Sequence, residues 1–163
     1  MVMAKNKEPI TPAVRALREA GIPFQGFPYT YQAGGGTGQF AREFELDEHQ
    51  VIKTLVMEDE ARRPLIVLMH GDKEVSTKAL ARYLGVKTVQ PCDPAVAQRH
   101  TGYQVGGTSP FGARKTLPVY CEAGIADLSS IYINGGKRGY IIALATQDML
   151  GLLQPKLVAV RAD

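Results

Sequence analysis

Residues 51–70, VIKTLVMEDEARRPLIVLMH, contain two apolar stretches separated by a charged segment. VIKTLVM at 51–57 and PLIVLMH at 64–70 are rich in the aliphatic and β-branched residues that favour buried strands. EDEARR at 58–63 is a polar turn of a length that joins antiparallel strands. The pattern therefore predicts a buried β-hairpin.

Helices and further strands are predicted on both sides of this hairpin. Thr11 as N-cap and Pro12 at the first helical position begin a helix over 11–20 that stops at Gly21. Further helices are expected at 39–46, 76–85, 95–100 and 146–153. Further strands are expected at 24–31, 86–89, 117–121, 130–134, 139–145 and 156–160, the first of them an edge strand because it contains Pro28. A flexible loop, AGGGTG, is expected at 33–38.

The whole chain of 163 residues is expected to form one domain. It has 45% hydrophobic and 21% charged residues, which is normal for a folded domain, and it shows no repeat, linker or composition break. We therefore predict a single α+β domain over 1–163 with a mixed, largely antiparallel sheet.

Several classes of protein and site are disfavoured. The longest apolar stretches, 64–69 and 140–145, are far shorter than the roughly 20 residues that span a bilayer. The N-terminal segment, 1–14, carries lysines without the apolar core of an export signal, so a cytoplasmic protein is expected. Cys92 and Cys121 are expected to be reduced thiols. No histidine or cysteine has metal-ligand spacing, so neither a metal nor a cofactor is expected.

Lys53 is the most informative single residue. In an alternating strand it shares a face with Val51, Leu55 and Met57, so an ammonium group lies on an apolar face. A lysine whose stem covers apolar surface at the rim of the sheet explains this pattern. A cation held beside an anionic or polarised substrate group explains it as well.

Two glycine-rich segments are candidates for ligand contact. GGTSPFG at 106–112 can bring main-chain N–H groups close to a ligand, although a tight turn is an equally good reading. It lacks the Gly-Lys-Thr step of a phosphate-binding Walker loop. NGGKRG at 134–139 reads as a hairpin turn that needs glycine for positive φ. Ser109 has no histidine or acid at the spacing of a serine-hydrolase motif.

Basic residues occur in three dibasic pairs within loops. The net charge is only +3, so the placement of charge matters more than its sum. If the pairs converge they form one phosphate-facing surface, whereas separate solvated loops are the commoner outcome. The pairs are Arg62 and Arg63, Arg114 and Lys115, and Lys137 and Arg138.

Four segments in order resemble one protein family. TPAVRALREAGIPF at 11–24, VIKTL at 51–55, GYQVGGTSPFG at 102–112 and IYINGGKRGY at 131–140 are similar to the YbaK family of aminoacyl-tRNA deacylases. These are relatives of the editing domain of bacterial prolyl-tRNA synthetases. The resemblance spans nearly the whole chain and implies a sheet that closes into a barrel-like core with flanking helices.

The resemblance also implies a function and a set of site residues. The expected activity is hydrolysis of misacylated tRNA in trans, above all of Cys-tRNA(Pro), with the thiol of the substrate attacking its own ester. Lys53 would be the catalytic residue and would hold the aminoacyl-adenosine end. Tyr29, Thr54, Gly106, Gly107, Ser109, Asn134 and Gly135 would bind the substrate, and the three dibasic pairs would bind the tRNA. Prolyl-tRNA synthetase is a further partner that the resemblance suggests.

Two positions depart from the family pattern. Asn134 stands where the family hairpin often has serine, and Ile141 stands where some members have an acidic residue. These departures leave open a deacylase for another small amino acid such as alanine. They also leave open a non-catalytic module of the same fold that binds tRNA or a synthetase, and the glycine loops leave open a binder of small phosphates or nucleotides.

Overall fold

The computed structural model describes residues 9–163, so part of the N-terminal segment on which the export expectation rests lies outside the described residues. The helices are α1 (Pro12–Glu19), α2 (Gly36–Glu43), α3 (Thr77–Leu84), α4 (Pro94–Thr101) and α5 (Thr146–Leu153), with 3-10 turns η1 (Glu48–Gln50) and η2 (Ala123–Asp127). The strands are β1 (Gln25–Pro28), β2 (Val51–Asp59), β3 (Pro64–His70), β4 (Glu74–Val75), β5 (Val89–Pro91), β6 (Val119–Glu122), β7 (Ser130–Lys137), β8 (Tyr140–Ala145), β9 (Lys156–Val158) and β10 (Arg161–Ala162).

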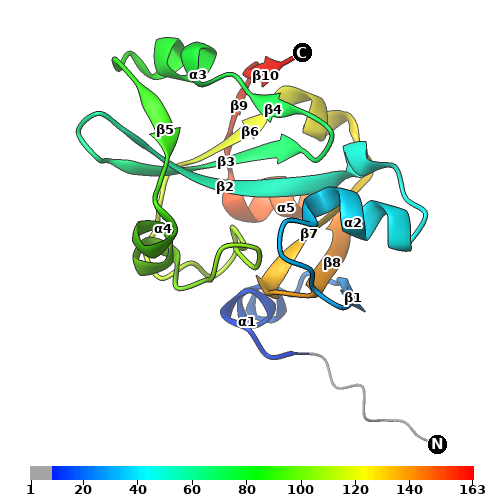
Figure 1. Cartoon of the computed structure of the whole chain (residues 1–163). Coiled ribbons are helices and arrows are strands. Elements are labelled where there is room, and N and C mark those ends of the chain that lie inside the picture. Colours follow the sequence, from blue (N-terminus) through cyan, green and yellow to red (C-terminus); the bar gives the residue numbers. More distant parts are fainter. Residues whose placement is uncertain (1–8) are drawn as a thin grey trace, which may run out of the picture.

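The strands form a mixed sheet in the order β1-β8-β7-β2-β3-β6-β9, and β5 pairs with the far end of β2 (Figure 1). The pairs β1–β8, β7–β8, β2–β3 and β2–β5 are antiparallel, whereas β2–β7, β3–β6 and β6–β9 are parallel. A separate antiparallel pair joins β4 and β10. The predicted α+β class and mixed sheet are confirmed, while closure of the sheet into a barrel stays a prediction.

The predicted hairpin at 51–70 is confirmed as β2 and β3. Its register runs from Ile52 opposite His70 to Glu58 opposite Pro64. The carboxylate of Asp59 shapes the turn, because it accepts hydrogen bonds from the main-chain N–H of Ala61 and of Arg63. Asp59 therefore stabilises the turn through these two hydrogen bonds.

Some boundaries differ from those expected. α2 begins at Gly36, inside the segment expected to be a flexible loop, because Gln39 Nε2 bonds the Thr30 carbonyl and ties the helix to the preceding chain. β5 lies at 89–91 and not at 86–89, and the expected strand at 156–160 ends at Val158. The predicted edge position of β1 is confirmed, since β8 is its partner in the sheet.

Apolar side chains pack on both faces of the sheet. α1 and α5 cover one face through residues such as Leu17 and Met149, and α3 covers the other through Leu80. An aromatic cluster around Phe40 anchors α2 against β1 and β7. No helix within residues 9–163 is long and apolar enough to cross a membrane.

His70 is a fully buried polar residue at the end of β3. Its ring stacks on that of His49 with centroids 3.6 Å apart, and its Nδ1 lies 2.8 Å from the His49 carbonyl oxygen. Among residues 9–163, its Nε2 has no hydrogen-bond partner. Burial lowers the pKa of His70, against the opposing effect of the hydrogen bond to the His49 carbonyl.

This burial predicts a loss of stability in weak acid. The unfolded chain binds a proton at His70 with a pKa of about 6.5, and the folded chain binds it less readily. The free energy of unfolding should therefore decrease as the pH falls below about 6.5. Urea unfolding between pH 7.5 and 5.5 should show this slope in His100→Gln, a background chosen because burial lowers the pKa of His100 too. Adding His70→Phe should flatten the slope, and an unchanged slope would contradict the assignment.

Candidate active site

A cavity of about 800 Å³ opens where one edge of β2 has no neighbouring strand. β7 pairs with Val51 and Ile52, and β5 pairs with Met57–Asp59. Between these two stretches, no strand of the described part of the chain covers this edge of β2. Side chains from both faces of β2 therefore reach the cavity, and a continuous run from Ile52 to Met57 lines it.

Thr54 presents main-chain and side-chain polar groups at this gap. The N–H of Cys92 donates to the Val56 carbonyl at 3.0 Å, so the main-chain groups of Val56 point toward β5. Main-chain groups of successive residues in a strand point to opposite edges. Thr54 lies two residues before Val56, so its main-chain groups point to the same edge as those of Val56, into the gap. Thr54 Oγ1 is also buried and, among residues 9–163, has no hydrogen-bond partner. A ligand at the gap can form hydrogen bonds with the main-chain N–H, the main-chain carbonyl and the Oγ1 of Thr54.

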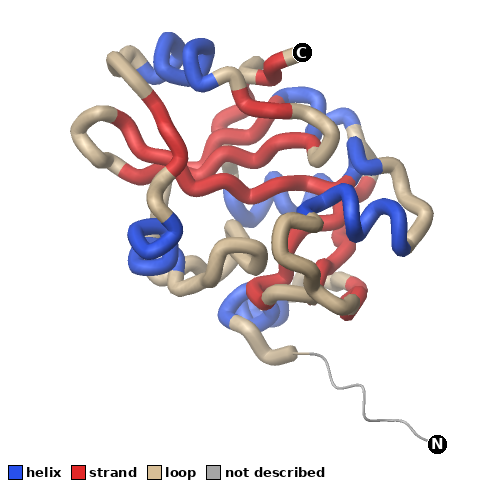
Figure 2. The backbone as a smooth tube through the Cα atoms, in the orientation of Figure 1, coloured by secondary structure: helices blue, strands red, loops and turns tan. Residues whose placement is uncertain are grey.

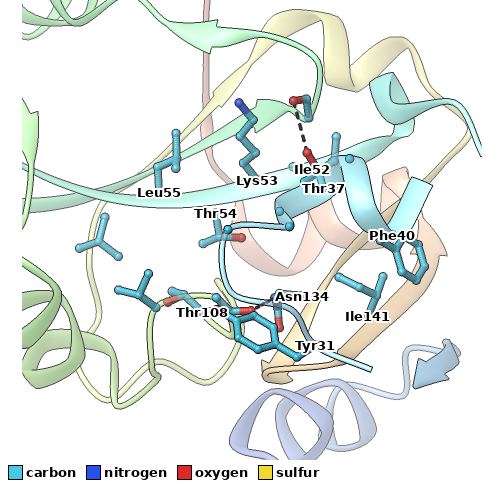
Figure 3. A pocket seen from close by; sticks show the side chains of 18 of the residues that line it. Tyr31, Thr37, Phe40, Ile52, Lys53, Thr54, Leu55, Thr108, Asn134 and Ile141 are labelled. Carbon is cyan, nitrogen blue, oxygen red and sulfur yellow. Dashed lines mark hydrogen bonds between the residues drawn. The ribbon is translucent and has the colours of Figure 1, made fainter. Parts of the chain in front are cut away.

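Lys53 lies on the other side of β2 from Thr54 (Figure 3). Its ammonium group donates to the Lys73 carbonyl at 2.7 Å and to the Glu74 carboxylate at 3.0 Å. The Lys53 side chain is 19% exposed and that of Glu74 is 82% exposed. An ammonium group has three N–H donors, so one remains for a ligand after these two bonds.

The remaining walls come from segments far apart in the sequence. The chain before α2 and α2 itself form one wall, β4 and the start of α4 form others, and Asn134 and Ile141 come from β7 and β8. In Figure 2 the irregular loop that follows α4 runs between α4 and the β7–β8 hairpin, and its residues Val105, Gly106 and Thr108 line the cavity. The cavity thus combines polar groups on β2 with an apolar side formed by Phe40 and Ile141.

Five predicted site residues line this cavity, namely Tyr29, Lys53, Thr54, Gly106 and Asn134. Asn134 also joins two walls, because its Nδ2 donates to the Gly106 carbonyl at 2.9 Å. Its Oδ1 accepts a hydrogen bond from the N–H of Gly136 at 3.3 Å. The departure from serine at this position therefore has a structural consequence, the fixing of the 105–108 loop on β7.

Three residues predicted to bind the substrate, Gly107, Ser109 and Gly135, lie outside the cavity lining. Ser109 is fully buried and its Oγ accepts a hydrogen bond from the Phe111 N–H. A Cβ on Gly107 would meet the Arg138 nitrogen at 2.7 Å, and one on Gly135 would meet the Tyr140 ring at 2.6 Å. These residues permit close packing behind the cavity wall.

Tyr31 is a cavity residue that the sequence did not single out. A Cβ added to Gly106, whose φ is +91°, would lie 2.5 Å from the Tyr31 hydroxyl oxygen. The Arg138 guanidinium lies 5.0 Å from the centre of the Tyr31 ring and donates to the Val105 carbonyl at 2.9 Å. The aromatic segment at 24–31 and Gly106 are both visible in the sequence, but their contact depends on the fold, which brings them together.

The dibasic pairs do not form one surface. Arg62 and Arg63 lie in the turn between β2 and β3 at the left edge of Figure 1. Lys137 and Arg138 lie at the β7–β8 turn, which is drawn just above α1 in the lower half of the same view. Arg63 bonds the Asp59 carboxylate at 2.7 Å, and Arg138 stacks on Tyr31, so each has a structural contact of its own. Arg114 and Lys115 lie in a third place, beside the end of α4.

Cys92 lines the cavity as a protonated thiol. Burial, together with the nearby Glu58 carboxylate, raises its pKa to about 12. Its Sγ lies 3.5 Å from Glu58 Oε1. A thiol nucleophile needs the opposite shift toward the thiolate. Among residues 9–163, the cavity lining includes no histidine, whereas the Thr37 hydroxyl in the lining donates to the Glu48 carboxylate at 2.7 Å.

Gly71 closes the cavity near the start of β2 and predicts a large effect of substitution. A Cβ there would lie 2.6 Å from the Val51 carbonyl, 2.7 Å from Thr37 Oγ1 and 2.8 Å from the Glu48 carbonyl. Gly71→Ala should lower the free energy of unfolding by about 1–3 kcal/mol, measured in urea. Gly151→Ala is the control, because a Cβ meets nothing within 4 Å there and should add about 0.5–1 kcal/mol to a helix interior. Equal effects of both substitutions would contradict the packing at Gly71.

Comparison with known proteins places these features in a family. Residues 36–152 match the family model described as the aminoacyl-tRNA editing domain. EbsC of Enterococcus faecalis, named as a candidate Cys-tRNA(Pro)/Cys-tRNA(Cys) deacylase, is 29% identical over 152 residues, which cover 92% of this chain and 93% of EbsC. The proline–tRNA ligase of Brachyspira hyodysenteriae is 24% identical over 94 residues, which are 58% of this chain but 16% of the ligase.

A solved structure supports the fold. A candidate trans-editing enzyme for prolyl-tRNA synthetase superimposes with a TM-score of 0.80, covering 95% of this chain and 100% of that one at 18% sequence identity. At this identity the likeness concerns the fold alone. The family match covers more than two thirds of the chain and includes β2, the 105–108 loop and the β7–β8 hairpin. The chain belongs to the aminoacyl-tRNA editing domain family.

Proposed function

We propose that this protein hydrolyses the ester bond of misacylated tRNA in trans, with Cys-tRNA(Pro) as its main substrate. The observation that carries this proposal is the cavity at the gap in β2, where Lys53 keeps one N–H donor after its two bonds and Thr54 Oγ1 has no hydrogen-bond partner among residues 9–163. Membership of the editing family and the name of the similar EbsC protein support the same activity. We place the action in the cytoplasm, where charged tRNA is made, and within one domain.

The chemistry of the cavity favours attack by a group of the substrate. Cys92 is held as a thiol, and the cavity lining contains no histidine to activate a hydroxyl group. In Cys-tRNA the cysteinyl thiol can attack its own ester carbonyl. The C–S bond forms, the C–O bond to the ribose breaks, and the proton lost by the thiol ends on the ribose oxygen. The products are a thiolactone and free tRNA, and water then opens the thiolactone to cysteine, which completes the net hydrolysis.

In this mechanism the protein positions the substrate and stabilises the charge that develops during the reaction. Lys53 would direct its remaining N–H toward the aminoacyl-adenosine end and act as a cation. The Thr54 main chain and hydroxyl would bind polar atoms of the aminoacyl group at the strand edge. Tyr29 and Asn134 would complete the polar contacts from the opposite walls.

The amino-acid preference would follow from the apolar side of the cavity. Ile141 is 4% exposed and packs with Phe40, so a small apolar side chain or a thiol is expected there. Alanine differs from cysteine by one sulfur atom, and a difference of one methylene group is worth only about 1–3 kcal/mol in such a pocket. Ala-tRNA(Pro) is therefore the alternative substrate.

Two substrates test the proposal directly. Wild-type protein should release cysteine from Cys-tRNA(Pro), and a tRNA carrying S-methylcysteine should remain intact at the rate of buffer alone. Equal cleavage of both substrates would contradict attack by the substrate thiol but would still identify the protein as a deacylase. If neither substrate is cleaved but tRNA still binds, the protein is a non-catalytic tRNA-binding module and not an enzyme. Addition of prolyl-tRNA synthetase to the same assay tests the synthetase as a partner.

A further inference from the structure

Four basic side chains converge at the C-terminal end of α4. Arg99 and His100 lie in the last turn of this helix, while Arg114 and Lys115 come from the loop that follows it. The N–H of Arg114 bonds the Thr101 carbonyl at 2.9 Å, and the N–H of Lys115 bonds the His100 carbonyl at 3.1 Å. These bonds to helix-end carbonyls fix the dibasic pair beside α4. We call these four residues the α4 basic cluster.

Two side chains of the α4 basic cluster are in direct contact, and a third passes over the end of the helix. Lys115 Nζ lies 3.2 Å from His100 Nδ1, and the Arg114 side chain passes 3.6 Å from where a Cβ of Gly102 would lie. Burial, then the charges of Lys115 and Arg99, lower the pKa of His100. His100 is thereby favoured in its neutral form, which accepts a hydrogen bond from Lys115, while the positive charges of Lys115 and Arg99 remain beside it.

Carboxylates do not neutralise this cluster. Within residues 9–163, none of its arginine and lysine side chains forms a salt bridge, whereas Arg63, Lys53 and Arg161 each do. Glu58 is the acidic group that acts on His100, and it is buried and bonded to Cys92. A helix C-terminus favours basic residues in its last turn, which accounts for Arg99 and His100. It does not account for two further cations brought from a loop.

The α4 basic cluster borders the cavity. Ala97 lines the cavity and lies one helical turn before His100, on the same side of α4. Cys92, at the entry to α4, lines the cavity too. The loop that carries Arg114 and Lys115 also supplies Gly106 and Thr108 to the cavity wall. Anions bound at the cluster therefore lie beside a ligand in the cavity.

We propose that the α4 basic cluster binds backbone phosphates of the tRNA acceptor stem and so directs the 3′ end into the cavity. This inference rests on the proposed function, which supplies an RNA with its reactive end in the cavity. Arginine forms bidentate bonds with phosphate, and successive phosphates suit a cluster of several separate cations. The pairs at 62–63 and 137–138 lie elsewhere and are not part of this surface.

A charge-matched comparison tests the cluster. The variant Arg99→Gln, Arg114→Gln, Lys115→Gln removes three positive charges from it. The control variant Lys78→Gln, Arg82→Gln, Lys87→Gln removes three exposed positive charges on and after α3, which lies at the top of Figure 1, at the other end of β5 from α4. Binding of fluorescein-labelled uncharged tRNA(Pro) is measured by anisotropy over a series of salt concentrations. Thermal unfolding verifies that both variants fold.

The cluster variant should bind tRNA roughly 10- to 100-fold more weakly, and its salt slope should fall by about two to three, one for each lost phosphate contact. The control variant should change both by much less. Binding of a single-stranded 3′-terminal fragment, which lacks the stem, should be the same in the cluster variant and the wild type. Equal loss in cluster and control variants, or equal loss with the fragment, would overturn the assignment. Because the tRNA is uncharged, this result is independent of whether the protein deacylates.

Discussion

Lys53→Ala should lower the rate of Cys-tRNA(Pro) deacylation by at least an order of magnitude and leave the fold intact. Positioning and electrostatic support are all that the proposed mechanism takes from the protein, and an ill-positioned reactant can cost about 100-fold in rate. The fold should tolerate the change because the partner carboxylate of Glu74 is 82% exposed and returns to water. A single-turnover time course at fixed pH measures the rate, and urea unfolding measures the stability.

Two further variants separate the role of Lys53 from that of its charge. Lys53→Arg should restore little activity, because a planar guanidinium cannot make the same bonds to the Lys73 carbonyl and a ligand. Lys78→Ala removes one exposed lysine from α3 and should retain the wild-type rate. Equal rates for Lys53→Ala and the wild type would remove Lys53 from the mechanism.

Gly106→Ala should also lower the rate of deacylation by at least about tenfold, because it displaces part of the cavity wall that positions the substrate. The new Cβ would lie 2.5 Å from the Tyr31 hydroxyl oxygen and 2.9 Å from Tyr31 Cε1, so the ring must move. Arg138 stacks on this ring and bonds the Val105 carbonyl, so the displacement spreads to the 105–108 loop. The expected readout is a loss of single-turnover rate together with a smaller loss of stability.

Gly34→Ala is the matched control for this prediction. Gly34 lines the same cavity with φ of +78°, but a Cβ there meets nothing within 4 Å. Both substitutions therefore carry the cost of a positive φ, about 1–2 kcal/mol, and only Gly106→Ala displaces a neighbour. Similar rates for the two variants would mean that the Tyr31 contact has no part in the activity.

Local sequence patterns predicted most of the secondary structure. The hairpin of β2 and β3 followed from two apolar runs around a charged turn, and α1 followed from Thr11, whose side chain accepts a hydrogen bond from the Val14 N–H. The start of α2 was wrong because Gly36 reads as a loop residue, while a distant bond from Gln39 to Thr30 holds it in place. Tertiary contacts of this kind leave no local pattern.

The candidate site was predictable only in part. Lys53 stood out because a charge on an apolar strand needs a reason, and it lies in the cavity. The importance of Thr54 depends on a gap between β7 and β5 along one edge of β2, which is a property of the sheet order. Ser109 was expected to bind the substrate, but it is buried outside the cavity lining and its Oγ accepts a hydrogen bond from the Phe111 N–H. The position of Arg114 beside the end of α4 depends on how the loop folds back on this helix.

The most direct test of the central claim is a deacylation time course with three substrates. Purified wild-type protein is mixed with Cys-tRNA(Pro), Ala-tRNA(Pro) or correctly charged Pro-tRNA(Pro), and ester loss is compared with buffer alone. We predict rapid loss of cysteine and no loss of alanine or proline above the buffer rate, because neither of these carries a thiol that can attack the ester. Buffer rates for all three substrates, with tRNA binding intact, would contradict the assignment of this protein as an editing deacylase.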